Sequence, residues 1–165
     1  VSDTHGRDAE CDSEMALDEN GKILAIRVKA DYGLGAYLSA SAPVPACIGS
    51  MVYQNVYEYD AMHIHIRVVF SNTTWTGPYR GAGRPEAVYV VERLLDIAAD
   101  EMGIDPVEIR QRNYIAKDKM PYTTLIPTVY DSGDFSRITD HAAEIAGDKR
   151  VARLAALSGP PELRW

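Results

Sequence analysis

A glycine- and arginine-rich stretch, residues 76–86, is the feature that most constrains how this chain folds. It separates a run rich in β-forming residues from a long apolar run with helical periodicity. Its glycines allow a tight turn and a close approach of the backbone to a ligand. The first turn of the following helix presents unpaired N–H groups and a partial positive charge. The stretch therefore predicts a strand, a sharp bend and a buried helix in that order.

Two interpretations of this bend stay open at the level of the residues. In one, the amides of the bend, the helix N-terminus and a guanidinium face a single point and form an anion cradle. In the other, the bend is an ordinary tight turn that carries two surface arginines. The candidate donors of the cradle therefore lie within residues 76–86.

Composition narrows the class of protein. The 165 residues suffice for one domain with a core, and a net charge of −7 argues against general nucleic-acid binding. No apolar run is long enough to span a bilayer, and no secretory signal opens the chain. The two cysteines, Cys11 and Cys47, lie in unrelated contexts, so we expect free thiols in a reducing compartment, the cytoplasm.

Alternation of apolar and polar residues predicts three strands. Residues 9–17 and 24–28 read as an antiparallel hairpin, with acidic side chains on the first strand and basic ones on the second. Residues 62–70 form the clearest strand. His63 and His65 share one of its faces at a spacing that could hold a metal, but no third ligand is near in sequence, which favours a solvated or interface face.

Three helices follow from apolar stripes and capping residues. The first has Pro85 at its first position and runs to residue 102, where Gly103 ends it; the second has Asp105 as its N-cap and runs from Pro106 to about residue 113. A third begins after Asp134, and a stripe is expected to be buried, namely Phe135, Ile138, Ala142 and Ile145.

The remaining segments complete a prediction of an α+β fold, with a mixed or antiparallel sheet layered against helices. Residues 149–157 are expected to be helical and residues 158–165 to form a frayed tail. An aromatic wall is expected to belong to the core or to a subunit interface: Tyr53, Tyr57 and Tyr59.

Several motifs occur in one order that resembles the large, molybdopterin-binding subunit of molybdenum hydroxylases. That family includes xanthine dehydrogenases, aldehyde oxidases or oxidoreductases and aerobic carbon monoxide dehydrogenases. The motifs are residues 34–39 (LGAYLS), 78–87 (PYRGAGRPEA), 92–93 (ER), 105–106 (DP) with 110–113 (RQRN), and 130–135 (YDSGDF). The resemblance reaches to about residue 157, so residues 1–157 are expected to be part of the first molybdopterin-binding domain.

The resemblance implies a cofactor and partners. Family members carry molybdopterin, here expected in its cytosine dinucleotide form, and hydroxylate a small substrate oxidatively with a glutamate as general base. Electrons leave through iron–sulfur clusters to a flavin, so the expected partners are the rest of the large subunit, a small 2Fe–2S subunit and a medium FAD subunit. The glutamate segment and the segments that grip the pterin are absent from these residues. We therefore expect the chain alone to be inactive and to bind no cofactor.

The resemblance implies cofactor-binding residues only at the bend, namely Arg80, Gly81, Ala82 and Gly83. Arg80 matches the arginine whose main chain lies against the molybdenum centre, and Gly81 and Ala82 match positions beside the metal's open side. Carbon monoxide-oxidising members have a copper-holding cysteine where this chain has Gly81, which argues against CO oxidation. The arginine that orients purines falls near Ser50, which argues against purines. Aldehydes or heterocycles remain as expected substrates.

Other functions are also compatible with the sequence. A non-catalytic module could hold phosphate or sulfate at the same bend, and a structural remnant would fold without function. In either case, faces that meet the rest of a larger subunit would be exposed, and the chain would self-associate through them.

Overall fold

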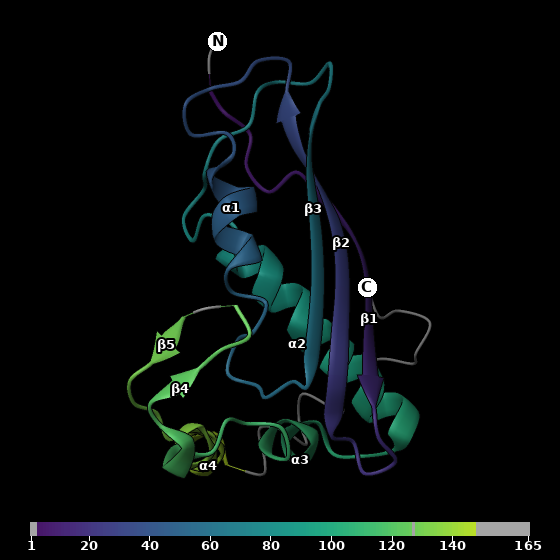
Figure 1. The fold of residues 1–165 in the computed structure, drawn as a ribbon, viewed down its shortest axis with the longest axis vertical. Coiled ribbons are helices and arrows are strands. Elements are labelled where there is room, and N and C mark those ends of the chain that lie inside the picture. Colours follow the sequence, from purple (N-terminus) through teal and green to yellow (C-terminus); the bar gives the residue numbers. More distant parts are fainter. Residues whose placement is uncertain (1–2, 127, 148–165) are drawn as a thin grey trace.

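A three-stranded mixed sheet forms the centre of the computed structural model, which describes residues 3–126 and 128–147 (Figure 1). Strand β1 (Ala9–Leu17) pairs antiparallel with β2 (Ile23–Gly35), and β2 pairs parallel with β3 (Ala61–Phe70). The strand order is β1–β2–β3, so β2 is central. The predicted hairpin, the third strand and the α+β class are confirmed. Of the two predicted sheet types, mixed or antiparallel, the sheet is mixed.

Two helices cover one face of this sheet. Helix α1 (Val44–Ser50) lies in the crossover between the parallel strands β2 and β3, and α2 (Arg84–Met102) packs against both α1 and β1. Along most of each strand, more buried side chains alternate with more exposed ones, many of them charged, as the period of two requires. The core between the sheet and the helices holds apolar residues of every layer, including Ile26, Val28, Tyr32, Val91 and Leu95.

The aromatic wall belongs to this core. Tyr53, Tyr57 and Tyr59 are almost completely buried. The hydroxyls of Tyr53 and Tyr59 find no hydrogen-bond partner among the described residues, so burial raises the pKa of both phenols.

Helix α2 begins one residue earlier than expected. Gly83 is its N-cap, Arg84 its first residue and Pro85 its second, so proline occupies the second helical position and not the first. Gly103 ends the helix in a left-handed conformation, as predicted. The next helix, α3 (Pro106–Gln111), is capped as expected by Asp105, whose carboxylate accepts from two backbone amides.

A buried asparagine joins α3 to the hairpin turn. The Asn113 side chain accepts from the Ile23 amide at 2.7 Å and donates to the carbonyls of Gly21 at 2.7 Å and Ile109 at 2.8 Å. The side chain is fully buried, so each of these groups would otherwise lack a partner. Asn113 therefore fastens the β1–β2 turn to the far end of the helical layer.

The chain then runs through a short 3₁₀ turn (Lys117–Lys119) and a small two-stranded sheet, β4 (Tyr122–Thr123) with β5 (Val129–Tyr130), into α4 (Phe135–Ala146). Asp134 caps α4, as predicted. The expected helix over 149–157, the frayed tail 158–165 and the boundary between them lie outside the described residues.

The predicted burial of the α4 stripe is wrong. Ile138 and Ile145 are 66% and 74% exposed, Ala142 is exposed as well, and only Phe135 is half-buried. The helix meets the body of the protein near its first turns, where Thr139 bonds to the hydroxyl of Tyr114. Its apolar stripe points elsewhere, and no described residue covers it.

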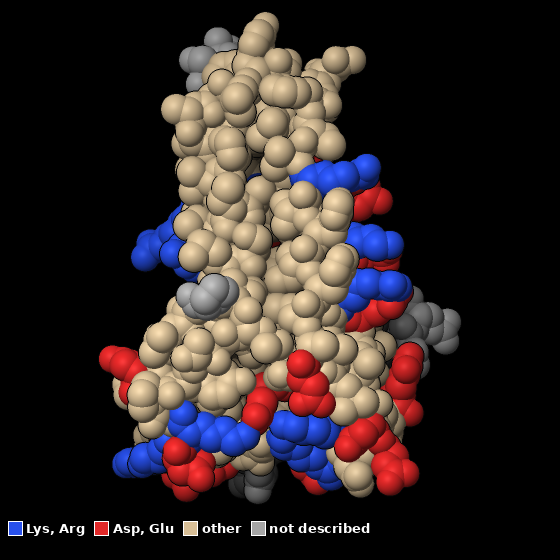
Figure 2. Space-filling model, viewed as in Figure 1, with Lys and Arg blue, Asp and Glu red and all other residues tan. Residues whose placement is uncertain are grey.

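Charge is distributed unevenly over the surface. Figure 2 shows no charged side chains over the uppermost part of the molecule, whereas Lys, Arg, Asp and Glu gather along its sides and at the lower end. Residues 32–57 and 68–79 contain no Asp, Glu, Lys or Arg. These two runs carry strongly exposed apolar side chains, including Tyr37, Leu38 and Phe70. No helix in the described ranges is both long and apolar enough to cross a bilayer.

Candidate functional site

The bend between β3 and α2 has an unusual backbone. Three successive residues have positive φ: Gly81 at 96°, Ala82 at 47° and Gly83 at 90°. Only glycine adopts such angles without strain, and Ala82 does so against its own preference. Arg80, which precedes them, is exposed, whereas Gly83 is buried. The structure thus brings all four predicted site residues together in one left-handed turn.

Close packing explains both glycines. A Cβ on Gly83 would lie 1.9 Å from the carbonyl oxygen of Pro45 and 2.8 Å from the amide nitrogen of Gly49, both in α1. A Cβ on Gly81 would lie 2.6 Å from Cγ of Pro85. The bend therefore rests directly on the backbone of α1, and a side chain at either position would displace it.

The bend retains hydrogen-bond donors for a ligand. Its own turn uses the Ala82 amide, which donates to the Tyr79 carbonyl at 2.8 Å, and the Arg84 amide, which donates to the Gly81 carbonyl at 3.1 Å. The amides of Gly81 and Gly83 have no partner within the described residues, and the Arg80 guanidinium has none there either. These two backbone amides and this cation are the candidate donors for an anion.

A groove lies beside the start of α2. It runs between β1 and α2 with a volume of 770 Å³, and its lining includes Arg7, Cys11, Glu86, Tyr89 and Ile97. Residues 80–83 do not line it. The bend therefore supplies an open wall and not an enclosed pocket, and a complete site would need further chain on its outer side.

Acidic and basic groups meet at this wall. Glu86 lies in the first turn of α2, where a carboxylate is stabilised by the helix dipole, and its side chain is only 12% exposed. Arg7 donates to it at 2.9 Å. Pattern reasoning did not single out Arg7, because nothing near it in sequence signals a contact with a residue 79 positions away.

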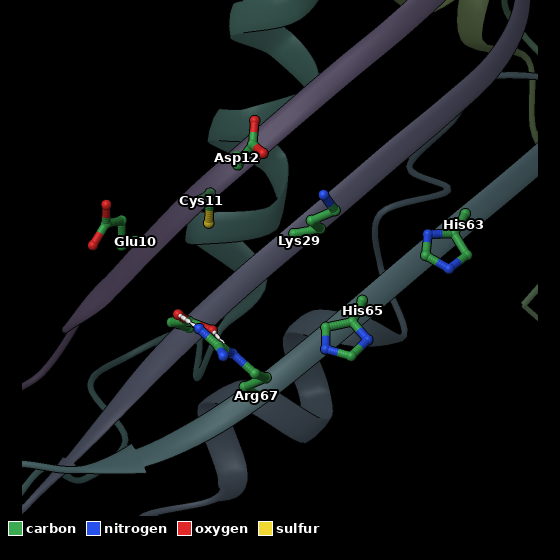
Figure 3. A pocket seen from close by; sticks show the side chains of 8 residues that line it. Glu10, Cys11, Asp12, Lys29, His63, His65 and Arg67 are labelled. Atoms are coloured by element: carbon green, nitrogen blue, oxygen red, sulfur yellow. Dashed lines mark hydrogen bonds and ion pairs between the residues drawn. The ribbon is translucent and has the colours of Figure 1, made fainter.

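The two histidines lie on the charged outer face of the sheet. A 490 Å³ hollow there is lined by residues of all three strands (Figure 3), among them His63, His65 and Lys29. No group of three potential metal ligands occurs in the part of the chain that the structure describes. The solvated strand face that the sequence favours is confirmed for both histidines, which are exposed.

Charge pairs run across this outer face in register. Asp31 accepts two hydrogen bonds from the guanidinium of Arg67, which faces it from β3, and this holds the pKa of the Asp31 carboxyl below its usual range. Glu14 likewise pairs with Arg27 across the hairpin. The Glu14–Arg27 pair confirms the predicted acid–base complementarity of the hairpin, and both pairs point to a structural role.

Two of the sequence motifs also form a structural network. Arg110 donates to Glu92 at 2.7 Å and to Asp96 at 2.8 Å, and it also reaches two backbone carbonyls. The hydroxyl of Tyr57 donates to Glu92 at 2.8 Å. Burial would lower the pKa of Arg110, but its hydrogen bonds to Asp96 and Glu92 raise it above its ordinary value. This network joins α2 to α3 and does not face the bend.

Known proteins resemble this chain in sequence over most of its length. The molybdopterin cofactor-binding domain family matches residues 1–114. The chain is 31% identical, over 88% of its length, to the 6-hydroxypseudooxynicotine dehydrogenase complex subunit gamma of Paenarthrobacter nicotinovorans. It is 36% identical, over 78% of its length, to the carbon monoxide dehydrogenase large chain of Hydrogenophaga pseudoflava. The chain spans 19% and 16% of these two relatives.

Solved structures share the fold. Quinoline 2-oxidoreductase from Pseudomonas putida 86 superposes with a TM-score of 0.87 at 26% identity, covering 94% of this chain and 20% of that one. The Cu,Mo-CO dehydrogenase in its carbon monoxide reduced state gives a TM-score of 0.82 at 28% identity, covering 93% of this chain and 20% of that one.

Proposed function

Because this chain belongs to the molybdopterin cofactor-binding domain family, we propose that its bend forms one wall of the cofactor site in a molybdenum hydroxylase large subunit. The observation that carries the proposal is the left-handed turn at residues 81–83, which rests on α1 and keeps two amides unpartnered among the described residues. Donors held in place by a rigid scaffold are what an anionic cofactor needs.

The residues present fit such a group. The amides of Gly81 and Gly83 would donate to its oxygen or sulfur atoms, and the Arg80 guanidinium would offset its negative charge. Gly83 is small enough to seat the turn on α1, so that the cofactor can approach the backbone closely. When bound, the cofactor supplies the redox chemistry of the hydroxylation. We propose the cytosine dinucleotide form of molybdopterin for this site.

The substrate class we propose is an aldehyde or an N-heterocycle. Gly81 offers no side-chain ligand for copper, which disfavours carbon monoxide. Several relatives are named for heterocycles, among them nicotine 6-hydroxylase large subunit at 25% identity and quinoline 2-oxidoreductase at 26%. This choice rests on those names and on the residue at position 81.

We further propose that the chain acts within a larger assembly in the cytoplasm and is inactive alone. Its partners would be the remaining part of the large subunit, an FAD-binding medium subunit and a 2Fe–2S small subunit. The uncharged surface formed by residues 32–57 and 68–79 supports this, because exposed Tyr37 and Phe70 side chains would be covered in such an assembly. Relatives roughly five times as long are consistent with the same view.

A pair of substitutions at Ala82 tests the cofactor wall. Both Asp and Asn tolerate a left-handed backbone, so Ala82→Asp and Ala82→Asn should keep the turn, with φ near 47°, and differ by one charge. A carboxylate at this point would repel an anionic cofactor. In the complete large subunit we expect Ala82→Asp to lower bound molybdenum per chain roughly tenfold or more, whereas Ala82→Asn retains it. Equal molybdenum content in the two variants would refute the proposal that the bend forms a wall of the cofactor site.

A non-catalytic anion-binding module makes a different prediction from the same free amides. Inorganic phosphate added to this chain would then shift the ¹⁵N–¹H resonances of Gly81 and Gly83 with a saturable dependence on concentration. Saturable shifts together with no molybdenum in the assembled subunit would favour the module. Molybdenum in the assembled subunit, lost in Ala82→Asp, would favour the cofactor wall.

A further inference from the structure

The segment that precedes β1 lies along the chain entering the bend. His5 forms a parallel bridge with Thr76: its amide donates to the Trp75 carbonyl at 3.1 Å, and its carbonyl accepts from the Gly77 amide at 2.9 Å. A Cβ on Gly6 would lie 2.9 Å from Cβ of Tyr79, so the two segments are in close contact. This places Arg7 directly beside residues 79–86.

Arg7 spans the bend with three contacts. One arm of its guanidinium donates to the Arg80 carbonyl at 2.7 Å, and the other donates to the Glu86 carboxylate at 2.9 Å. Its central carbon lies 5.1 Å from the centre of the Tyr79 ring, within the range of a cation–π interaction. Arg7 is itself a non-glycine residue at a φ of 59°, an angle that is kept only where surrounding contacts demand it.

These contacts determine which way one free amide points. A trans peptide unit is planar, so the Arg80 carbonyl and the Gly81 N–H point in opposite directions. By holding the carbonyl, Arg7 directs the Gly81 N–H to the opposite side, away from itself. The ion pair also offsets the charge of Glu86, which would otherwise stand as a largely buried anion at the same wall.

We propose that Arg7 is a positioning residue for the cofactor-binding bend: it orients the Gly81 amide and neutralises Glu86. The cofactor part of this statement rests on the function proposed above. Arg7 acts through the bend, by its contacts with the Arg80 carbonyl and the Glu86 carboxylate.

The test separates orientation from charge. Arg7→Gln removes both the charge and the two-armed guanidinium, whereas Arg7→Lys keeps the charge but not the two arms. Arg27→Gln is the matched control, because it removes an exposed ion pair on the sheet face. In the full chain, hydrogen exchange would be measured at the amides of Ala82 and Arg84, which close the turn. We expect Arg7→Gln to speed their exchange about tenfold, since a hydrogen bond to a charged group is lost.

Retention of molybdenum by the complete large subunit is the second measurement. We expect Arg7→Gln to lose the metal on desalting, Arg7→Lys to retain an intermediate amount, and the double variant Arg7→Gln/Glu86→Gln to recover part of the loss, because no unpaired carboxylate remains. This rescue would show that part of the loss comes from the unpaired Glu86 carboxylate.

The outcomes are distinct. Unchanged exchange at Ala82 and Arg84 in Arg7→Gln, or an equal acceleration in Arg27→Gln, would overturn the positioning role. An absence of rescue by Glu86→Gln would overturn the neutralising role. If the wild-type subunit binds no molybdenum while exchange at the bend still responds to Arg7, the proposed function fails and the orientation of the bend by Arg7 stands.

Discussion

The packing of the bend against α1 can be tested by replacing the two glycines at the ends of α2 with alanine. Gly83 and Gly103 flank α2 and both have positive φ, 90° and 65°. A Cβ on Gly83 would meet the Pro45 carbonyl at 1.9 Å, whereas a Cβ on Gly103 would meet nothing within 4 Å. Alanine at either position therefore carries a backbone penalty, but only at Gly83 does it add a steric one.

The magnitudes follow from these two contributions. A left-handed conformation costs an alanine roughly 1–2 kcal/mol, so Gly103→Ala should lower the free energy of unfolding by about 1 kcal/mol once the loss of chain entropy in the unfolded state is included. Overpacking adds about 1–3 kcal/mol. Gly83→Ala should therefore lower it by about 2–4 kcal/mol, a large part of the ~5–15 kcal/mol typical of a whole domain.

Equilibrium urea unfolding of the wild type and the two variants, followed by circular dichroism, gives the difference directly. Gly103→Ala is the control for the backbone penalty. A loss in Gly83→Ala no greater than in Gly103→Ala would refute the reasoning, because it would mean that the bend does not rest on α1 as described. An unchanged slope with denaturant would show that only stability has changed.

Three further predictions concern other parts of the chain. Asn113→Ala leaves three buried backbone groups without partners and should lower the free energy of unfolding by about 2–5 kcal/mol in the same assay; a loss below 1 kcal/mol would contradict this. Arg67→Gln should raise the pKa of Asp31 toward its ordinary value, which carboxyl ¹³C NMR would measure. In the wild type, the stabilisation from this pair is fully present above the unfolded-state pKa of Asp31 and is lost as the pH falls through the lowered folded-state pKa. Self-association through the exposed stripe of α4 should be abolished by Ile138→Glu, and a wild type that sediments as a monomer at every concentration would exclude it.

Local patterns were sufficient for most of the elements. Alternation identified the three long strands, and capping residues such as Asp105 and Asp134 identified helix starts, because these signals act between neighbours in the chain. The parallel pairing of β2 with β3 could not be read in the same way. Alternating side chains look alike in parallel and antiparallel ladders, so the sequence left the sheet as either mixed or antiparallel.

The wrong prediction for α4 has a definite physical reason. An amphipathic stripe shows only that a face favours burial, and it does not say which chain covers it. Ile138 and Ile145 have the right spacing but no cover among the described residues. The resemblance of motifs also did not reveal what each residue does. Arg110 and Asn113 belong to the 110–113 motif, yet their side chains join α3 to α2 and to the hairpin.

At the candidate site, the sequence placed Arg80 to Gly83 on one turn, but it could not show the neighbours that shape that turn. Pro45 and Arg7 reach the bend from far along the chain, and contacts of that range leave no periodic signature. The left-handed angle of Ala82 also has no signal, because alanine ordinarily avoids it.

The asparagine that fastens the hairpin turn also sets an order of events during synthesis. Its partners at residues 21 and 23 lie 92 and 90 positions earlier, so the turn can be formed early but closed only after residue 113 has left the ribosome. Until then, the Ile23 amide and the Gly21 carbonyl lack their Asn113 partner. Closing so long a loop also has an entropic cost. Maturation of this hairpin should therefore be a late step, completed together with docking of the helical layer and not as an independent nucleus.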